Sequence, residues 1–293
     1  MVSHIHHGAS ESFWVSSALI SAAAFLYFRG WLGVRRERGN FEDWRAGSFV
    51  SGLLFIWTAT ASPLSALDHE MLTVHMVQHL LLMTLAPPLI LLGMPRRPLA
   101  LGLLQRSLQA IGLRSESMQQ LANVVRHPAL CWFAAAGALV LWHIPSVFML
   151  GLRSQVWHGA EQASFLAAGL LFWSPVVRPL SNRWKWPESS ILLYLFLATL
   201  PCDILSGFLV FCDRVVYPVF LSVPRSFGLS ALEDQQCAGA LMWTCVTVVY
   251  LIAGTVFTVR LLSPHRSEEL ATPQFDSRGV AARRTDPHRM EAV

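Results

Sequence analysis

Long apolar stretches, each about the length of a membrane-spanning helix, alternate along the chain with short polar segments. There are seven of them, at about residues 13–28, 46–67, 69–93, 128–150, 158–177, 190–211 and 234–262. About twenty apolar residues in an α-helix are enough to cross the hydrocarbon core of a bilayer. The pattern therefore predicts an all-α polytopic membrane protein, a bundle of seven transmembrane helices over residues 13–262.

The positive charges are concentrated in every second connecting segment. Nineteen of the 22 Lys and Arg residues lie in four segments, which are 29–45, 94–127, 178–188 and the tail that starts at Arg260. Because positive loops stay on the cytoplasmic side, this predicts an extracytoplasmic N-terminus and a cytoplasmic C-terminus. Residues 1–12 are then expected to form an extracytoplasmic tail. Residues 263–293 are expected to form a disordered cytoplasmic tail, because they are charged and poor in apolar side chains.

The composition excludes several classes of protein. A chain with 54% hydrophobic and 14% charged residues and a mean hydropathy of +0.46 is too apolar for a soluble domain of 293 residues. No pair of its five cysteines has CxxC spacing, which argues against a disulfide scaffold or a zinc knuckle. The basic residues lie in loops rather than on one soluble face, so nucleic acid is not an expected partner. Walker, Rossmann, GxSxG and HExxH motifs are all missing, and no enzymatic activity is expected.

The third apolar stretch is unusual because three histidines, His69, His75 and His79, fall in its first eleven residues. At about 100° of rotation per residue, His75 and His79 share one stripe of a helix, with Met71 above them and Gln78 beside them. His69 lies on another stripe. Ionisable groups within a span cost a few kcal/mol each and are therefore candidates for a functional site.

Further polar groups are expected on the same, outer side of other spans. His143 and Asp203 are expected at a depth similar to that of the histidine pair. Two other spans begin at the outer side with polar residues, which are His158 with Glu161 one turn later, and Glu233 with Asp234. The inner halves of the spans carry almost no ionisable residues. We therefore expect one polar pocket that opens to the extracytoplasmic face.

Imidazoles with a thioether and a carboxylate suit a soft or borderline metal, and copper is the first choice. The expected metal ligands are His75, His79, His143, Met71, His69, His158 and Asp203. Three further residues, Gln78, Glu233 and Asp234, are expected to orient the imidazoles. If Met1 were removed, the N-terminal amine and His4 would form a square-planar Cu(II) or Ni(II) site, and His6 and His7 would add capacity. A loose polar tail is the favoured interpretation, because such a tail needs no metal to explain it.

Other interpretations of these histidines stay open. His75 and His143 would serve as the two axial ligands of a haem, for which the small residues 134–138 would leave room. The histidines would also serve simply to hold helices together in a scaffold that docks oxidase subunits without a metal. A coupled transporter would need ionisable groups that continue to the inner side, and these are missing.

The chain also resembles a known family, the seven-span CtaG-type cytochrome c oxidase assembly factors. The resemblance covers most of residues 45–262, and its motifs are HMVQH at 75–79, APPLILLGMP at 86–95, WHIP at 142–145, DILSG at 203–207, Tyr217-Pro218 and LEDQQCAGALMW at 232–243. It implies a multi-pass protein of the bacterial plasma membrane that is needed for maturation of a haem-copper oxidase, at the stage of copper delivery. The implied partners are cytochrome c oxidase subunits, and a soluble extracytoplasmic copper chaperone is a further candidate.

Overall fold

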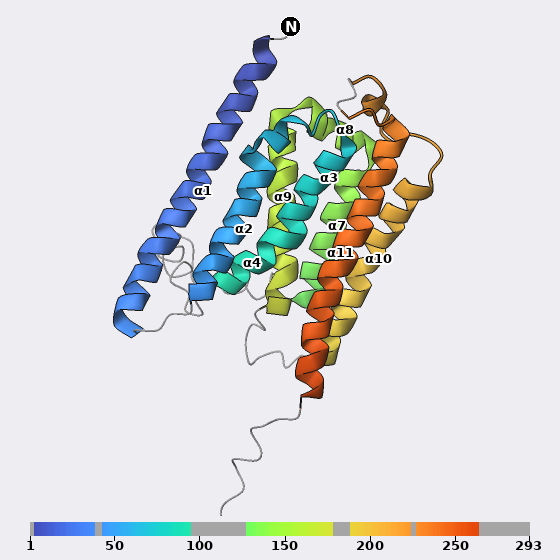
Figure 1. The fold of residues 1–293 in the computed structure, drawn as a ribbon. Helices are drawn as coiled ribbons and strands as arrows, with labels where there is room; N and C mark the ends of the chain where they lie inside the picture. The colour runs from blue at the N-terminus through green and yellow to red at the C-terminus, as the bar shows by residue number, and fades with distance from the viewer. Residues whose placement is uncertain (1–2, 39–42, 95–126, 178–187, 224–226, 264–293) are drawn as a thin grey trace, which may run out of the picture.

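The computed structural model describes residues 3–38, 43–94, 127–177, 188–223 and 227–263. Within these ranges all regular secondary structure is helical, and the helices stand side by side in a bundle (Figure 1). The helices of the bundle are α1 (Ser3–Arg38), α2 (Asp43–Ala61), α3 (Leu72–Leu80), α4 (Ala86–Gly93), α7 (Pro128–His143), α9 (Gln155–Val177), α10 (Glu188–Phe211) and α11 (Ala231–Leu262). The remaining elements are η1 (Pro63–Ala66), η2 (Leu81–Leu85), α8 (Pro145–Arg153) and η3 (Pro218–Leu221). The all-α class is confirmed.

Five helical segments are long and apolar enough to cross a membrane, and there are six if the bent pair α7 and α8 is counted as one span. The chain is therefore a multi-pass membrane protein. The seven spans of the sequence prediction are not confirmed, because α9 is not among these segments. This helix has 23 residues, enough for a crossing, but it carries the polar side chains of His158, Glu161 and Gln162.

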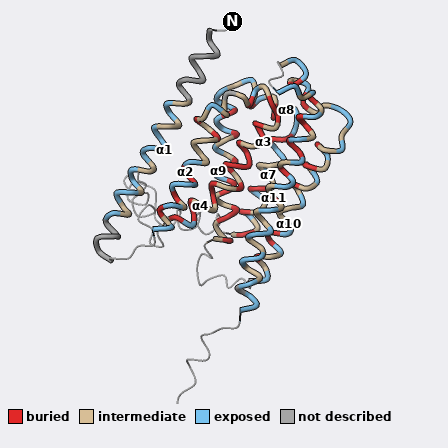
Figure 2. The backbone as a smooth tube through the Cα atoms, in the orientation of Figure 1, coloured by how far each residue is buried: buried red, intermediate tan, exposed pale blue. Residues whose placement is uncertain are grey.

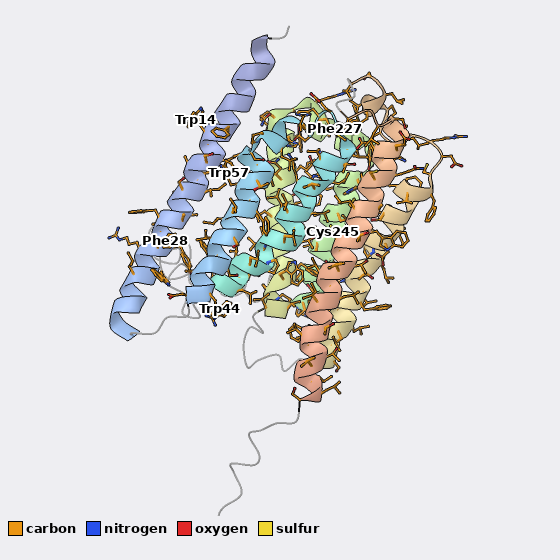
Figure 3. The ribbon with its side chains drawn as sticks, in the orientation of Figure 1. Trp14, Phe28, Trp44, Trp57, Phe227 and Cys245 are labelled. Atoms are coloured by element: carbon orange, nitrogen blue, oxygen red, sulfur yellow. The ribbon has the colours of Figure 1, made fainter. Side chains whose placement is uncertain are left out.

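The first helix is longer than the sequence predicted. α1 begins at Ser3, so residues 3–12, expected as a tail, continue the helix instead. It lies along the side of the bundle, where the Tyr27 ring stacks on Phe49 of α2 and the Tyr27 hydroxyl donates to the Gly93 carbonyl. Trp14 on α1 is exposed (Figure 3), as expected for a helix in lipid. The side chains of His4, His6 and His7, and the tail 264–293, lie outside the described part of the chain.

The third apolar stretch forms two α-helices, α3 and α4, which the wide helical turn η2 joins directly. α3 begins at Leu72, later than predicted, and His69 lies in the turn before it. The segment η2 is a π-helical turn, in which the Ala86 amide donates to the Leu81 carbonyl five residues earlier. Pro87 and Pro88 explain this turn, because neither has an amide hydrogen for the preceding carbonyls and their rings crowd them.

The fourth apolar stretch was predicted as one helix over residues 128–150, and the structure corrects this. α7 ends at His143, and α8 leaves at 77° to it. Ile144 between them is extended, with φ −65° and ψ 124°. A residue before proline avoids the helical region, so Pro145 accounts for the bend. His143 therefore lies at a helix end instead of inside one continuous helix.

The buried residues lie on the inner faces of α2, α3, α4, α7, α9, α10 and α11 (Figure 2). Two glycines allow close approach of helices here. A Cβ at Gly169 of α9 would lie 2.6 Å from the Met83 carbonyl, and one at Gly239 of α11 would lie 2.9 Å from the Ser206 carbonyl. The interior that these helices enclose contains ten polar or charged side chains, among them four histidines, and an eleventh, Asp68, lies in the connection before α3.

Candidate metal site

The N-terminus of α3 is fixed by a side chain from α11. Met71 at the N-cap provides no side-chain hydrogen bond. Instead, the Asp234 carboxylate accepts from the backbone amides of Leu72 (2.7 Å) and Thr73 (3.1 Å), and the Thr73 hydroxyl donates to the Asp234 carbonyl (3.0 Å). A carboxylate here satisfies free amides and matches the positive end of the helix dipole. Asp234 therefore positions the whole helix that carries the histidine pair, and does not touch an imidazole.

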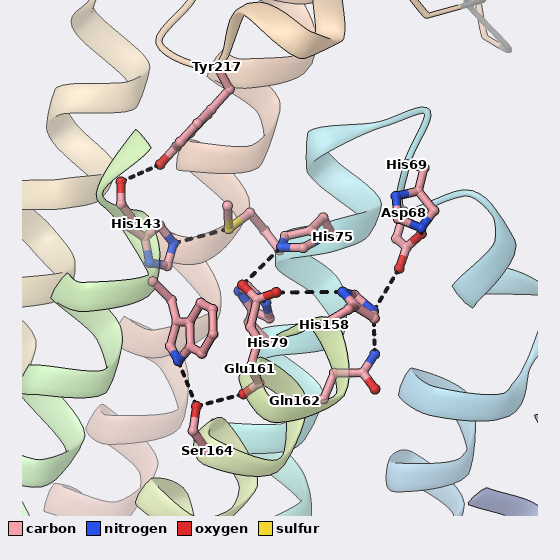
Figure 4. A network of polar contacts seen from close by, with 12 residues as sticks. Asp68, His69, His75, His79, His143, His158, Glu161, Gln162, Ser164 and Tyr217 are labelled. Atoms are coloured by element: carbon pink, nitrogen blue, oxygen red, sulfur yellow. Dashed lines mark hydrogen bonds and ion pairs between the residues drawn. The ribbon is translucent and has the colours of Figure 1, made fainter. Parts of the chain in front are cut away.

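A fully buried carboxylate, Glu161 of α9, lies at the centre of the polar cluster (Figure 4). Its Oε1 lies 3.4 Å from His75 Nε2 and 3.3 Å from His79 Nε2. Its Oε2 lies 3.5 Å from His158 Nδ1, one turn earlier on the same helix. Gly151 of α8 leaves room for this carboxylate, because a Cβ there would lie 2.6 Å from Oε2.

A second carboxylate, Asp68, lies in the connection between η1 and α3 and extends the cluster outward. Its Oδ2 lies 3.1 Å from His158 Nε2, and its Oδ1 lies 3.6 Å from His69 Nε2. The His69 side chain is 51% exposed, whereas Asp68 and His158 are buried. His69 is thus the outer rim of the cluster.

Asp68 lies outside the membrane-spanning segments, and its carboxyl has a pKa below the usual value. Burial alone would raise this pKa, because it disfavours the charged form. The hydrogen bond with His158 and the nearby His69 outweigh that effect, so the carboxyl stays ionised. The outer part of the cluster therefore combines a fixed negative charge with two imidazoles.

The atoms around Glu161 approach one another at ion-pair distance but without the geometry of hydrogen bonds. Among the described residues, neither nitrogen of His75 or His79 and neither oxygen of Glu161 has a hydrogen-bond partner. Buried polar atoms of this kind are costly unless something occupies the space between them. Four ligands held about 2.1 Å from a tetrahedral ion lie about 3.4 Å apart, which is close to the separations from Glu161 Oε1 to the two Nε2 atoms. The donor set therefore fits a metal ion.

Two groups of side chains in the described ranges offer three ligand atoms within 4.8 Å of one another: His75, His79 and Glu161, and Asp68, His75 and His158. Because His75 belongs to both, the two groups are adjacent. Each pairs two imidazoles with one carboxylate. They bring together three of the predicted metal ligands, His75 and His79 of α3 and His158 of α9.

Other predicted residues lie elsewhere. Met71 is buried at the N-cap, off the helical stripe assumed for it. Asp203 is half-buried on α10 and belongs to neither three-ligand group. Glu233 is used in a capping box with Ser230 at the start of α11. Gln78 is buried, and neither end of its amide has a hydrogen-bond partner among the described residues.

His143 belongs to a neighbouring contact. Its Nδ1 lies 2.7 Å from the Leu139 carbonyl and its Nε2 lies 3.3 Å from the Met76 sulfur. The Tyr217 hydroxyl donates to the His143 carbonyl (2.9 Å), which otherwise lacks a donor at the helix end. The His79 and His143 rings are 5.9 Å apart, so this contact adjoins the Glu161 cluster (Figure 4).

Two central residues, Glu161 and Asp68, were not predicted as ligands from the sequence. A signal for Glu161 existed, because it follows His158 by three residues and so shares its helix face. Asp68 directly precedes His69, but a residue in a connection has no predictable direction. Only the packing of α8 and α9 against α3 makes these carboxylates central.

The fold and the cluster define a class of protein: a multi-pass helical membrane protein with histidines and carboxylates gathered in its interior. A family model narrows this class. The model for the cytochrome c oxidase caa3 assembly factor family, Caa3_CtaG, matches residues 25–263, and the chain belongs to this family of oxidase assembly factors.

One curated relative is the uncharacterized protein ML1998 of Mycobacterium leprae (strain TN). It is 22% identical over 255 residues, which are 82% of this chain and 38% of the relative. The chain therefore spans well under half the length of that protein. No solved structure matches the chain.

Proposed function

We propose that this assembly factor handles copper during oxidase maturation and holds the ion between His75, His79 and Glu161. The observation that carries the proposal is the convergence of three buried ligand atoms that lack hydrogen-bond partners among the described residues. Two imidazoles and a carboxylate bind divalent first-row metals, and within that series Cu(II) binds most tightly. An open fourth position would let the ion be exchanged.

The route to this site is proposed to start at the extracytoplasmic face. In the proposed topology the bundle crosses the bacterial plasma membrane seven times, with α7 and α8 as one span and α9 as another, the N-terminus outside and the C-terminus inside. The positive loops support this orientation. His69 and the Asp68–His158 pair would then receive copper from outside, from a soluble chaperone, and His75 would pass it inward to Glu161.

The haem alternative has weaker support from the site. A haem between His75 and His143 would need both Nε2 atoms to face one cavity. The His75 Nε2 lies 3.4 Å from Glu161, whereas the His143 Nε2 lies 3.3 Å from Met76. A scaffold without metal would leave the Glu161 oxygens and the nitrogens of His75 and His79 buried without hydrogen-bond partners among the described residues.

The test is metal analysis and an optical spectrum of the protein purified in mild detergent after growth with copper. We expect about one copper per chain at the Glu161 site. Glu161→Gln, which keeps the side-chain volume but removes the charge, should abolish that copper, as should the double variant His75→Ala/His79→Ala. Asp203→Asn is the matched control, because this half-buried carboxylate on α10 belongs to neither three-ligand group, and it should keep the metal.

Three outcomes would contradict the proposal. Zinc in place of copper, in protein offered both metals, would show a site for another ion. A Soret band lost in His143→Ala would favour the haem alternative. No metal in the wild type, together with normal oxidase maturation by Glu161→Gln in cells, would favour the scaffold.

A further inference from the structure

The contact between His143 and Met76 joins two atoms that both carry lone pairs. A carbonyl only accepts, so His143 Nδ1 must donate to Leu139. A neutral imidazole then has an unprotonated Nε2, and this atom faces the Met76 sulfur at 3.3 Å. A thioether sulfur has no hydrogen to donate. Met76 is fully buried and His143 is nearly so.

A cation between the two atoms would resolve this contact. One candidate is a proton on Nε2, but a charged imidazole in an apolar span costs several kcal/mol, and no carboxylate of the described residues forms an ion pair with His143. The other candidate is a metal ion. Bonds of about 2.0 Å to nitrogen and about 2.3 Å to sulfur place two ligands about 3.5 Å apart at a tetrahedral angle. The observed separation is therefore close to that of two ligands of one ion.

The surroundings of the pair are rich in sulfur. A cavity of about 50 Å³ adjoins it, and its lining includes Met76, His79, Met83, His143, Cys202 and Met242. This volume exceeds the 10–15 Å³ or so that a single water requires, so an ion fits. Thioether and thiol ligands select soft ions, of which Cu(I) is the biological example. Carboxylates, by contrast, belong to the neighbouring Glu161 cluster.

We infer that Met76 and His143 form a second metal site, selective for Cu(I), beside the Glu161 site. The inference rests on the proposed copper function and extends it to a pair of sites of different chemical character. His79 connects them, since its ring centroid lies 4.4 Å from that of His75 and 5.9 Å from that of His143. It borders the sulfur-lined cavity and also faces Glu161.

The second site also has an opening to the side of the bundle. His143 lines a groove of about 1050 Å³ between α7 and α10, whose other walls include the exposed side chains of Phe133, Leu193, Ile204 and Phe208. An ion at His143 is therefore separated from the outer surface of the bundle by one side chain. This position suits a site from which copper leaves in the plane of the membrane.

The experiment uses the full-length protein in mild detergent, loaded with Cu(I) under anaerobic reducing conditions and studied by X-ray absorption. We expect a sulfur shell at about 2.3 Å from the copper. Met76→Leu conserves side-chain volume and should remove the sulfur shell and weaken Cu(I) binding about tenfold or more. His143→Gln should weaken Cu(I) binding similarly. Met149→Leu is the control, because Met149 of α8 is not among the residues that line the cavity and should behave like the wild type.

The outcomes separate this inference from the proposed function. Cu(II) bound per chain, measured on separate portions of the same preparations that are loaded with Cu(II) without reductant, should be unchanged in Met76→Leu and lost in Glu161→Gln. If the wild type shows no sulfur shell, or if the shell persists in Met76→Leu, the second site is refuted while the Glu161 site can stand. If Met76→Leu removes the shell but the wild type binds no Cu(II), the second site stands and the Glu161 site fails.

Discussion

Replacement of Asp234 by alanine tests whether α11 positions the metal cluster through the N-terminus of α3. In Asp234→Ala, the Leu72 and Thr73 amides lose their acceptor, while the bond from the Thr73 hydroxyl to the backbone carbonyl of residue 234 remains possible. Each buried donor left without a partner costs about 1–3 kcal/mol. An N-cap replaced by alanine costs about 0.5–2 kcal/mol in total. We therefore expect a loss of about 2–4 kcal/mol in the free energy of unfolding, toward the upper end because Asp234 is buried.

The assay is equilibrium unfolding in mild detergent, followed by tryptophan fluorescence, together with Cu(II) titration of the folded protein. The matched control is the neighbouring Glu233→Ala. Glu233 accepts only from the Ser230 amide and is exposed, so water replaces it and the loss should be smaller. Asp234→Asn keeps one acceptor oxygen and should recover part of the stability.

Copper binding should follow the same order, because the cap positions the helix that carries His75 and His79. Equal losses of stability in Asp234→Ala and Glu233→Ala would refute the reasoning. So would unchanged Cu(II) affinity in a clearly destabilised Asp234→Ala, since the cap would then have no influence on the site.

Two further predictions concern the carboxylates. Gly151→Ala places a Cβ 2.6 Å from Glu161 Oε2, and this carboxylate cannot move aside freely because three imidazoles surround it. We expect the amount of Cu(II) bound per chain to fall while the helical circular dichroism is retained. Full Cu(II) binding would contradict the geometry. Asp68 has a lowered pKa, so an unfolded chain binds its proton at higher pH than the folded protein does. Its stabilising contribution should be complete above about pH 4 and should decline as the pH falls below that value. Unfolding measured from pH 6 to pH 3 should show a weaker decline in Asp68→Asn than in the wild type, and identical profiles would refute the assignment.

The features that repeat along the chain were predictable from the sequence. Hydrophobic stretches of the right length gave the helical class, and the spacing of four residues placed His75 and His79 on one face. The structure agrees on both points, since both Nε2 atoms approach the same Glu161 oxygen. This agreement has a simple cause. Both features depend only on the helical repeat within one segment.

The features that depend on packing between segments were not predictable. Asp203 was predicted as a ligand because its expected depth along its span was similar to that of the histidines. Depth does not specify the direction in which a side chain points around a helix. Met71 was placed by extending a helix that in fact begins at Leu72. Glu161 is central only because α9 and α8 pack so that its side chain reaches α3. Such contacts need the three-dimensional arrangement.

The π-helical turn η2 sets the direction in which the histidine pair faces. A π turn contains one more residue than an α turn, and each residue of a regular helix advances the side chains by about 100°. α3 is therefore rotated against α4 by about that angle relative to an uninterrupted helix. Loss of one residue from Leu81–Leu85 would restore a regular helix and keep its apolar length. The same loss would rotate His75 and His79 away from Glu161. The direction in which both imidazoles point therefore depends on a single inserted residue, which two prolines keep in the helix.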